Sequence, residues 1–166
     1  MPSKPLAVRL LEQRGIAHEV FAFDAAIRSA DEVALATGMP PRAVYKTLVV
    51  EEDPPKGKPY LVMMPSDSEV DLKVLAASLG VKKLRMASHR DAERHTGLQV
   101  GGISALALLD RRMPTFIDER ALREGSVLVS AGQRGMDVRV SVAELIALTG
   151  ARPVRAAAGS GSAETG

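Results

Sequence analysis

The first 23 residues show a helical and then a strand-like spacing of apolar side chains. Apolar residues recur at helical intervals over 5–15, where Pro5 suits the first turn, Ser3 can cap the helix and Gly15 can end it. The following stretch, 18–23, contains Val and Phe, which favour the extended backbone of a strand. A helix followed by a β-strand is therefore expected here.

A second helix and a β-hairpin are expected next. Ser29 with Glu32 three positions later forms a capping box, and Gly38 provides a stop. The stretch 43–52 is rich in β-branched residues, and a polar loop separates it from a second apolar run at 60–64. Two such runs joined by a short polar loop are typical of a hairpin.

The remaining elements follow the same patterns. They are expected as a helix over 71–80, a strand over 82–86, a helix over 88–96, a strand over 115–117, a hairpin over 127–140 that turns at 132–135, and a helix over 142–148. Ser141 with Glu144 forms another capping box before the last helix. Strands adjacent in sequence occur together with strands separated by helices, which predicts an α/β fold with a mixed sheet.

One domain is expected. A chain of 166 residues is long enough for one well-formed core and too short for two typical domains. Apolar periodicity stops at Ala151, and the residues after Ala156 are mainly Ala, Gly and Ser, a composition typical of disorder. We therefore expect an ordered domain over 1–150 and a disordered tail over 151–166.

The composition narrows the classes of function. Aromatic residues make up only 3% of the chain, which disfavours binding of single-stranded nucleic acid by rows of stacked rings. The absence of Cys excludes disulfides, thiolate metal sites and a cysteine nucleophile. No segment approaches the length of a membrane span, so a cytoplasmic protein with no membrane partner is expected.

The charges are close to balanced. The 22 basic and 20 acidic residues leave a formal charge of +2, which supports only local attraction to a polyanion. Basic residues do gather in one stretch, made up of Lys82, Lys83, Arg85, Arg90 and Arg94. Such a stretch can meet RNA phosphates or form a solvated face, and the sequence leaves both interpretations open.

Lys46 is the first candidate for chemistry. In a strand it shares a face with Val44, Leu48 and Val50, so an ammonium is expected among apolar side chains. An unpaired buried charge is unfavourable, so Lys46 must find a partner or line a cavity. The alternative is a structural Lys whose ammonium reaches water along its aliphatic stem.

A glycine pair is the second candidate. Gly101 and Gly102, followed by Ser104, can let backbone N–H groups approach a ligand closely, as an oxyanion or phosphate cradle requires. Most glycine pairs are only turns, and both interpretations stay open at this point. The spacing does not match a P-loop, and no Lys-Ser or Lys-Thr pair follows it.

Ser130 and Asp137 form the third candidate because they flank a glycine-rich turn. A hydroxyl and a carboxylate placed there can bind a polar substrate, although the segment can equally be an ordinary hairpin turn. His89 and His95 lie six residues apart and so fall on different helix faces, which makes them a poor metal pair. We expect no metal and no cofactor.

Taken in order, these segments resemble the YbaK family, also known as the prolyl-tRNA synthetase-associated editing domain. The resemblance covers about residues 5–150 and rests on the order and spacing of the segments, because no single motif is decisive. The matching segments are 44–50, 71–73, 82–87, 96–97, 101–104, 114–118 and 130–135.

The resemblance implies an α/β single domain whose curved mixed β-sheet is flanked by helices, and an activity that removes a mismatched amino acid from the 3′ end of tRNA, often tRNA(Pro). It implies that Lys46 is essential, that Thr47 beside it binds substrate, and that Gly101, Gly102 and Ser104 lie at the reacting carbonyl. It also implies that Ser130 and Asp137 bind the substrate's polar groups. The attacking group can be a water, a ribose hydroxyl or the substrate's own side chain, and the resemblance favours help from the substrate.

Two positions depart from the family pattern. Ala105 stands where the glycine loop commonly has Pro, which is expected to loosen the loop, and Phe23 stands where cysteine-editing members tend to have Tyr. The resemblance therefore implies a deacylase of Cys-tRNA(Pro) or Cys-tRNA, with Phe23 in the substrate site and prolyl-tRNA synthetase as an expected partner. Editing of tRNA charged with Ala, Ser or Thr, a non-catalytic module that binds tRNA or a synthetase, and a general ester hydrolase are the alternatives.

Overall fold

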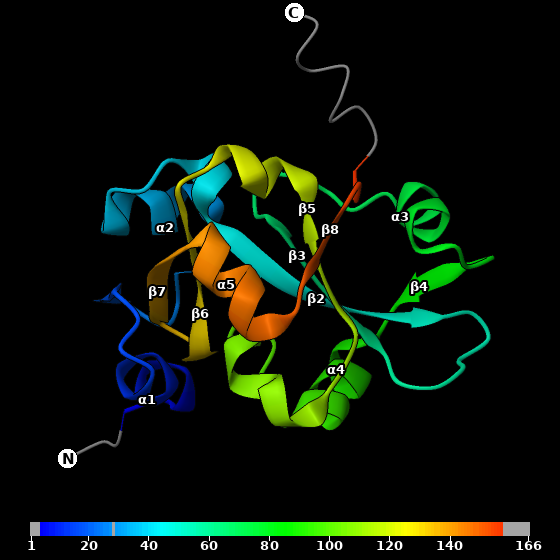
Figure 1. Cartoon of the computed structure of the whole chain (residues 1–166), viewed down its shortest axis with the longest axis horizontal. Helices are drawn as coiled ribbons and strands as arrows, with labels where there is room; N and C mark the ends of the chain where they lie inside the picture. The colour runs from blue at the N-terminus through cyan, green and yellow to red at the C-terminus, as the bar shows by residue number, and fades with distance from the viewer. Residues whose placement is uncertain (1–3, 28, 158–166) are drawn as a thin grey trace, which may run out of the picture.

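The structure, a computed structural model, describes residues 4–27 and 29–157 (Figure 1). Within these residues the α-helices are α1 (Leu6–Gln13), α2 (Ala30–Thr37), α3 (Leu72–Leu79), α4 (His89–Thr96) and α5 (Val142–Thr149). The strands are β1 (His18–Ala22), β2 (Tyr45–Glu52), β3 (Tyr60–Pro65), β4 (Leu84–Met86), β5 (Thr115–Asp118), β6 (Ser126–Gln133), β7 (Met136–Ser141) and β8 (Arg152–Val154). Short 3₁₀ helices are η1 (Pro41–Ala43), η2 (Leu106–Arg111) and η3 (Glu119–Arg123).

Local cap chemistry sets the helix ends as the sequence predicts. The N-cap side chains of α2, α3, α4 and α5 each accept a hydrogen bond from a first-turn N–H, and the N-caps are Ser29, Asp71, Ser88 and Ser141. Each of these helices ends at a left-handed glycine. Four predicted helices are thereby confirmed within the described residues; the predicted cap of α1, Ser3, lies outside them.

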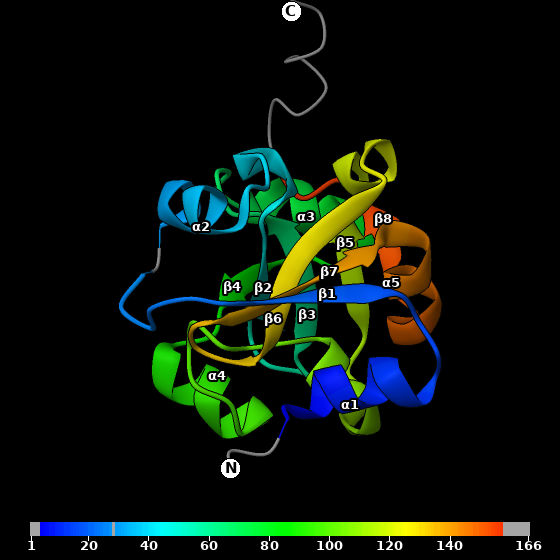
Figure 2. The ribbon, with the colours of Figure 1, turned by 90° about the vertical axis from the view of Figure 1, so that its left-hand side faces the viewer.

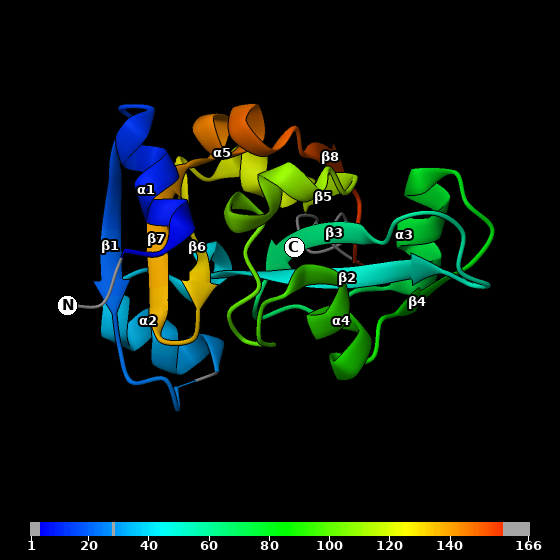
Figure 3. The same ribbon diagram turned by 90° about the horizontal axis from the view of Figure 1, so that it is seen from below.

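The mixed α/β fold is confirmed, and its strands divide into two sheets. One sheet is antiparallel with the order β1-β7-β6, and the other is mixed with the order β4-β2-β3-β5-β8. A parallel bridge between Val44, the residue before β2, and Leu128 of β6 links the two sheets. Figures 2 and 3 show the smaller sheet standing across one end of the larger one, so that β1 and β7 run at a steep angle to β2.

Period-two alternation places the core on both faces of the larger sheet. Tyr45 and Val49 of β2 pack into the main core with α1, α5 and the smaller sheet. Val50 packs on the other face against α3 and β4, and Leu48 contacts the same cluster. Lys46 belongs by alternation to this second face, as the sequence predicts. A third, small cluster lies under α2, where Val44 and Leu128 are buried.

The expected end of the ordered domain at residue 150 is wrong. The chain continues as β8, which pairs in parallel with β5, and Ala156 and Ala157 are buried. Pro153 lacks an N–H, and it is tolerated because β8 is the edge strand of its sheet. The rest of the predicted tail, 158–166, lies outside the described residues. In the part of the chain that the structure describes, no helix is both long and apolar enough to cross a bilayer.

Candidate active site

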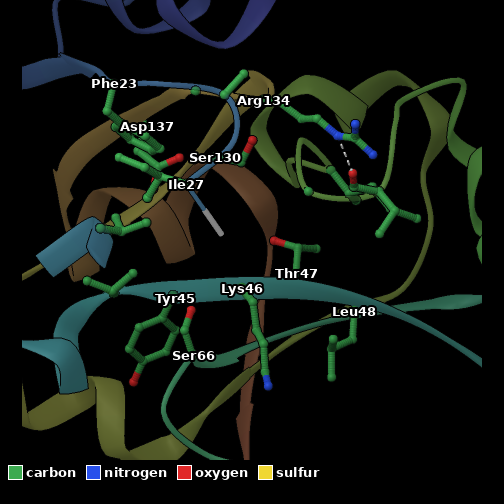
Figure 4. Close-up of a pocket in the computed structure, with 17 residues that line it drawn as sticks. Phe23, Ile27, Tyr45, Lys46, Thr47, Leu48, Ser66, Ser130, Arg134 and Asp137 are labelled. Carbon is green, nitrogen blue, oxygen red and sulfur yellow. Dashed lines mark hydrogen bonds between the residues drawn. The ribbon is translucent and has the colours of Figure 1, made fainter. Parts of the chain in front are cut away.

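A cavity of about 270 Å³ opens where the two sheets meet (Figure 4). Its size is at the lower end of the range for small-molecule sites, which suits a ligand of amino-acid size. One side is apolar and is formed by Phe23, Ala25, Ile27, Val33 and Val44. The remaining lining residues are Tyr45, Lys46, Thr47, Leu48, Ser66, Val100, Gly101, Ile103, Ser130, Arg134, Gly135 and Asp137.

Ser130 and Asp137 form the polar wall of the cavity. They are directly opposite each other on β6 and β7, because the hairpin turns between Gln133 and Met136 and a register shift between Ser130 and Gln133 then brings Ser130 opposite Asp137. The Ser130 hydroxyl accepts the N–H of Gly132 at 3.1 Å and keeps its own proton to donate. A carboxylate and a hydroxyl donor therefore stand side by side in the cavity.

The Asp137 carboxyl is a perturbed acid. Burial raises its pKa from 3.8 to about 6, because charging the group next to an apolar wall is unfavourable. In the described part of the chain its carboxylate has no hydrogen-bond or ion-pair partner. An acid that is ionised at neutral pH and lacks a partner can bind an ammonium group of a ligand.

Thr47 supplies main-chain as well as side-chain groups. The Ser66 N–H donates to the Val44 carbonyl at 2.7 Å, while the Ala87 N–H donates to the Val49 carbonyl at 3.0 Å from the other side of β2. Because hydrogen-bond direction alternates along an antiparallel strand, the N–H and C=O of Thr47 point away from β3. β4 pairs with β2 only from Val50 onward, so among the described residues this edge of Thr47 has no neighbouring strand.

Lys46 finds a partner outside the polar wall. Figure 4 shows its side chain leaving β2 on the side opposite Thr47. The Nζ atom donates to the main-chain oxygen of Ser68 at 2.8 Å, in the turn that follows β3. Lys46 is half-buried, lines the cavity, and has two further N–H donors on its ammonium. The structure thus places the ammonium away from Asp137 and next to the Ser68 turn.

The loop of the glycine pair packs on the β6–β7 turn. A Cβ atom on Gly102 would lie 2.8 Å from the carbonyl carbon of Gln133 and 2.9 Å from the nitrogen of Arg134. Arg134 lies over Gly101, and its Nε donates to the Val100 carbonyl at 2.8 Å. The loop and the turn are therefore held together by close backbone contact and by one charged hydrogen bond.

The two glycines differ in what they can donate. The Gly102 N–H is used in a turn, where it donates to the Gln99 carbonyl at 2.8 Å. Gly101 lines the cavity, and its N–H has no partner among the described residues. The expectation that both N–H groups face the reacting carbonyl is corrected, because the turn leaves only the Gly101 N–H without a partner.

Ser104 also differs from its expectation as a substrate-binding residue. It is 1% exposed, and its hydroxyl accepts the Ala107 N–H at 3.3 Å, so it supports the start of η2 instead of lining the cavity. Ala105 has a φ of −62°, the value that the usual Pro would impose. The loop therefore keeps at Ala105 the φ that a Pro would fix, and the expected loosening of the loop stays a prediction.

Arg134 is the lining residue that sequence reasoning missed. It stands between the two glycines of a turn, where an exposed side chain is the ordinary expectation, and its contact with Val100 is 34 residues away in sequence.

Two cations of the predicted basic stretch form ion pairs with carboxylates of the chain. Lys83 pairs with Asp53 at 3.4 Å and Arg85 with Glu51 at 3.2 Å, and both cations stay exposed at the surface.

No metal centre can be built from the described side chains, because no group of three or more His, Asp or Glu residues is placed to hold an ion. His95 instead contacts Glu51 at 3.2 Å. The cavity's lining residues therefore supply one carboxylate, hydroxyls, the anchored ammonium of Lys46, the guanidinium of Arg134 and main-chain groups.

Known proteins resemble the chain over most of its length. Residues 24–148 match the family model of the aminoacyl-tRNA editing domain. The chain is 33% identical over 148 residues to EbsC of Enterococcus faecalis, which is named as a candidate Cys-tRNA(Pro)/Cys-tRNA(Cys) deacylase, and the match covers 88% of each chain.

Two solved structures share the fold. A protein described as a candidate trans-editing enzyme for prolyl-tRNA synthetase superposes with a TM-score of 0.79 at 28% identity, covering 94% of this chain and 99% of that one. The hypothetical protein APE2540 superposes with a TM-score of 0.80 at 23% identity, covering 91% of this chain and 98% of that one. The second likeness concerns the fold alone.

Proposed function

The chain belongs to the aminoacyl-tRNA editing domain family, and from that premise we propose that it is a hydrolase that deacylates mischarged aminoacyl-tRNA, with Cys-tRNA(Pro) or Cys-tRNA as its main substrate. The observation that carries the proposal is the location of the cavity, because all but one of its lining residues fall inside the matched segment 24–148. A water molecule attacks the ester carbonyl, the bond to the ribose oxygen breaks, and the ribose hydroxyl and free amino acid leave.

Each cavity group has a role in this reaction. Asp137 binds the α-ammonium of the attached amino acid, and Ser130 donates a hydrogen bond beside it. The Gly101 N–H and the open main-chain edge of Thr47 polarise and orient the ester. An aminoacyl ester is already activated, so positioning and charge stabilisation suffice without a protein nucleophile.

The apolar wall selects the amino acid. Phe23, Ile27 and Val33 offer no hydrogen-bond partner to a hydroxyl side chain, so a thiol or methyl is preferred to a hydroxyl. We expect Cys-tRNA(Pro) to be deacylated at least ~10-fold faster than Ser-tRNA(Pro), with Ala-tRNA(Pro) between them. Initial rates on the three mischarged tRNAs measure this order. Equal rates on all three would show that the wall does not select.

Lys46 is assigned to binding and not to the bond-breaking step. Its ammonium is anchored on the Ser68 carbonyl, on the side of β2 opposite Thr47 and away from Asp137, so we assign it to the terminal nucleotide of the tRNA and not to the ester. Lys46→Met is expected to raise KM about 10-fold and to change kcat little, because the lost interaction is made equally in substrate and transition state. Steady-state deacylation of Cys-tRNA(Pro) measures both constants.

The control for this variant is Lys73→Met, which removes an exposed ammonium on α3 and is expected to change neither constant. A loss confined to kcat in Lys46→Met would place the ammonium at the ester. Tight tRNA binding by the wild type without any turnover would instead favour the non-catalytic module.

Recognition of tRNA(Pro) is assigned to a partner. The described residues offer a cavity of amino-acid size, and the exposed cations Lys83 and Arg85 already pair with Asp53 and Glu51. We propose that the protein works in the cytoplasm and in trans with prolyl-tRNA synthetase. Co-purification of the two proteins with charged tRNA tests this, and a deacylation rate that is unchanged by added synthetase would contradict it.

A further inference from the structure

A second polar cluster lies behind Lys46, at the end of β5 and in the turn after β3. Its centre is Asp118, a carboxylate that is only 1% exposed. It accepts three N–H groups of Arg120, namely the main-chain N at 2.9 Å, Nε at 2.9 Å and Nη2 at 3.1 Å. A buried carboxylate requires such a partner, and the two-pronged contact fixes the plane of the guanidinium.

The guanidinium has one more directed contact. Its Nη1 donates to the hydroxyl of Ser68 at 3.2 Å, across 52 positions of sequence. The Ser68 hydroxyl in turn donates to Asp67 at 3.3 Å, and the Ser68 N–H donates to the Pro65 carbonyl at 3.1 Å. The turn after β3 is thus held both to its own strand and to η3.

Ser68 is shared by two cations with different tasks. Its side chain receives Arg120, and its main-chain carbonyl receives the ammonium of Lys46 at 2.8 Å. A Lys side chain has four rotatable bonds and loses rotamer entropy when it is ordered. A fixed carbonyl at the end of that chain orders the ammonium before the substrate arrives.

We propose that Arg120 and Ser68 are positioning residues for Lys46: Asp118 fixes the guanidinium, the guanidinium fixes the Ser68 turn, and the turn aims the ammonium at the terminal nucleotide. The inference rests on the proposed role of Lys46 in binding. It places a determinant of substrate affinity on η3 and on the turn after β3. Neither Arg120 nor Ser68 lines the cavity.

Ser68→Ala tests the proposal with the smallest change. It removes the acceptor of Arg120 but keeps the main-chain carbonyl and leaves the Asp118–Arg120 pair intact. We expect KM for Cys-tRNA(Pro) to rise about 3- to 5-fold with kcat unchanged. The matched control is Ser126→Ala, which removes the acceptor of another arginine, Arg139 Nε at 2.9 Å, away from the cavity and is expected to leave both constants unchanged.

Two further variants separate positioning from simple support of the fold. Arg120→Lys keeps the positive charge beside Asp118 but loses the planar guanidinium that contacts both Asp118 and Ser68. It should reproduce the KM effect while unfolding at nearly the wild-type temperature. Ser68→Ala in the Lys46→Met background should add nothing, because the side chain that it positions is gone. A KM effect of Ser68→Ala that persists in that background would overturn the inference.

The outcomes also separate this inference from the proposed function. If Lys46→Met leaves KM unchanged, the assigned role of Lys46 fails, and the positioning inference fails with it. If Lys46→Met raises KM while Ser68→Ala behaves like Ser126→Ala, only the positioning inference fails.

Discussion

Asp137→Asn is expected to make the protein more stable at neutral pH and, in the same variant, to remove most of the deacylase activity. Burial raises the pKa of Asp137 from 3.8 to about 6, so between about pH 4 and pH 6 the folded protein holds this proton more tightly than the unfolded chain does. The free energy of unfolding contributed by Asp137 therefore falls as pH rises through this window, and the loss is complete above it.

An amide at position 137 does not ionise and avoids this loss. We expect Asp137→Asn to raise the free energy of unfolding by about 1–2 kcal/mol at pH 7.5 and to have little effect near pH 4. Urea unfolding at the two pH values measures the difference. Asp110→Asn, which changes an exposed carboxylate on η2, is the control and should show no such pH-dependent gain.

The deacylase activity of Asp137→Asn should fall although its stability rises. Asn carries no charge to pair with the α-ammonium of the substrate, and losing one partner of a partly buried charge pair typically costs 2–5 kcal/mol, so kcat/KM should fall at least ~30-fold. In the wild type kcat/KM should decline as pH falls through about 6, where Asp137 is protonated. A variant that is stabilised but fully active would remove Asp137 from substrate binding.

Much of the fold follows from local chemistry that a sequence displays directly. Ser29, Asp71, Ser88 and Ser141 cap helices in the structure as their spacing predicts, because a cap depends only on residues within one helical turn. The sequence likewise predicts the glycine-rich turn between Ser130 and Asp137, but their direct pairing depends on a register shift between Ser130 and Gln133 that no local pattern indicates. Local patterns thus predict the elements and the turn that carries the polar wall of the cavity.

Contacts between distant segments were beyond such patterns. The strands divide into two sheets, which a bridge from Val44 to Leu128 connects, and no local spacing indicates either feature. The partner of Lys46 is a main-chain carbonyl, which every residue possesses, so no residue type in the sequence marks Ser68. The strand β8 is short and contains Pro, a residue that lowers the expectation of a strand unless its edge position is known.

The glycine loop shows the same limit in a functional residue. The Gly101-Gly102 pair predicts a close backbone approach, and a close approach is present, but the partner at Gly102 is the backbone of Gln133 and Arg134. A sequence shows that a glycine can approach something and does not show whether that is a ligand or the protein. Gly102 therefore shapes the cavity wall, and Gly101 is the member of the pair that lines the cavity.

Gly102→Ala is accordingly expected to damage the site through the protein's own packing. The added Cβ would lie 2.8–2.9 Å from backbone atoms of the β6–β7 turn, which cannot swing aside as the end of a flexible side chain would. The loop and the turn must separate, which moves Gly101 and Arg134 away from Ser130 and Asp137. Overpacking of this kind typically costs 1–3 kcal/mol of stability, and a shift of about 1 Å in a reacting geometry lowers the rate ~100-fold.

Gly125→Ala provides a matched control because a Cβ there meets nothing within 4 Å, and neither glycine has a left-handed φ. Both substitutions therefore change the conformational freedom of the unfolded chain in the same way, and only Gly102→Ala adds a collision. The free energy of unfolding, measured in urea, and kcat/KM on Cys-tRNA(Pro) should both fall in Gly102→Ala. Neither should fall in Gly125→Ala. If the two variants kept equal activity, the loop and the turn would not need to touch for deacylation, and the cavity wall would have to be formed by other contacts.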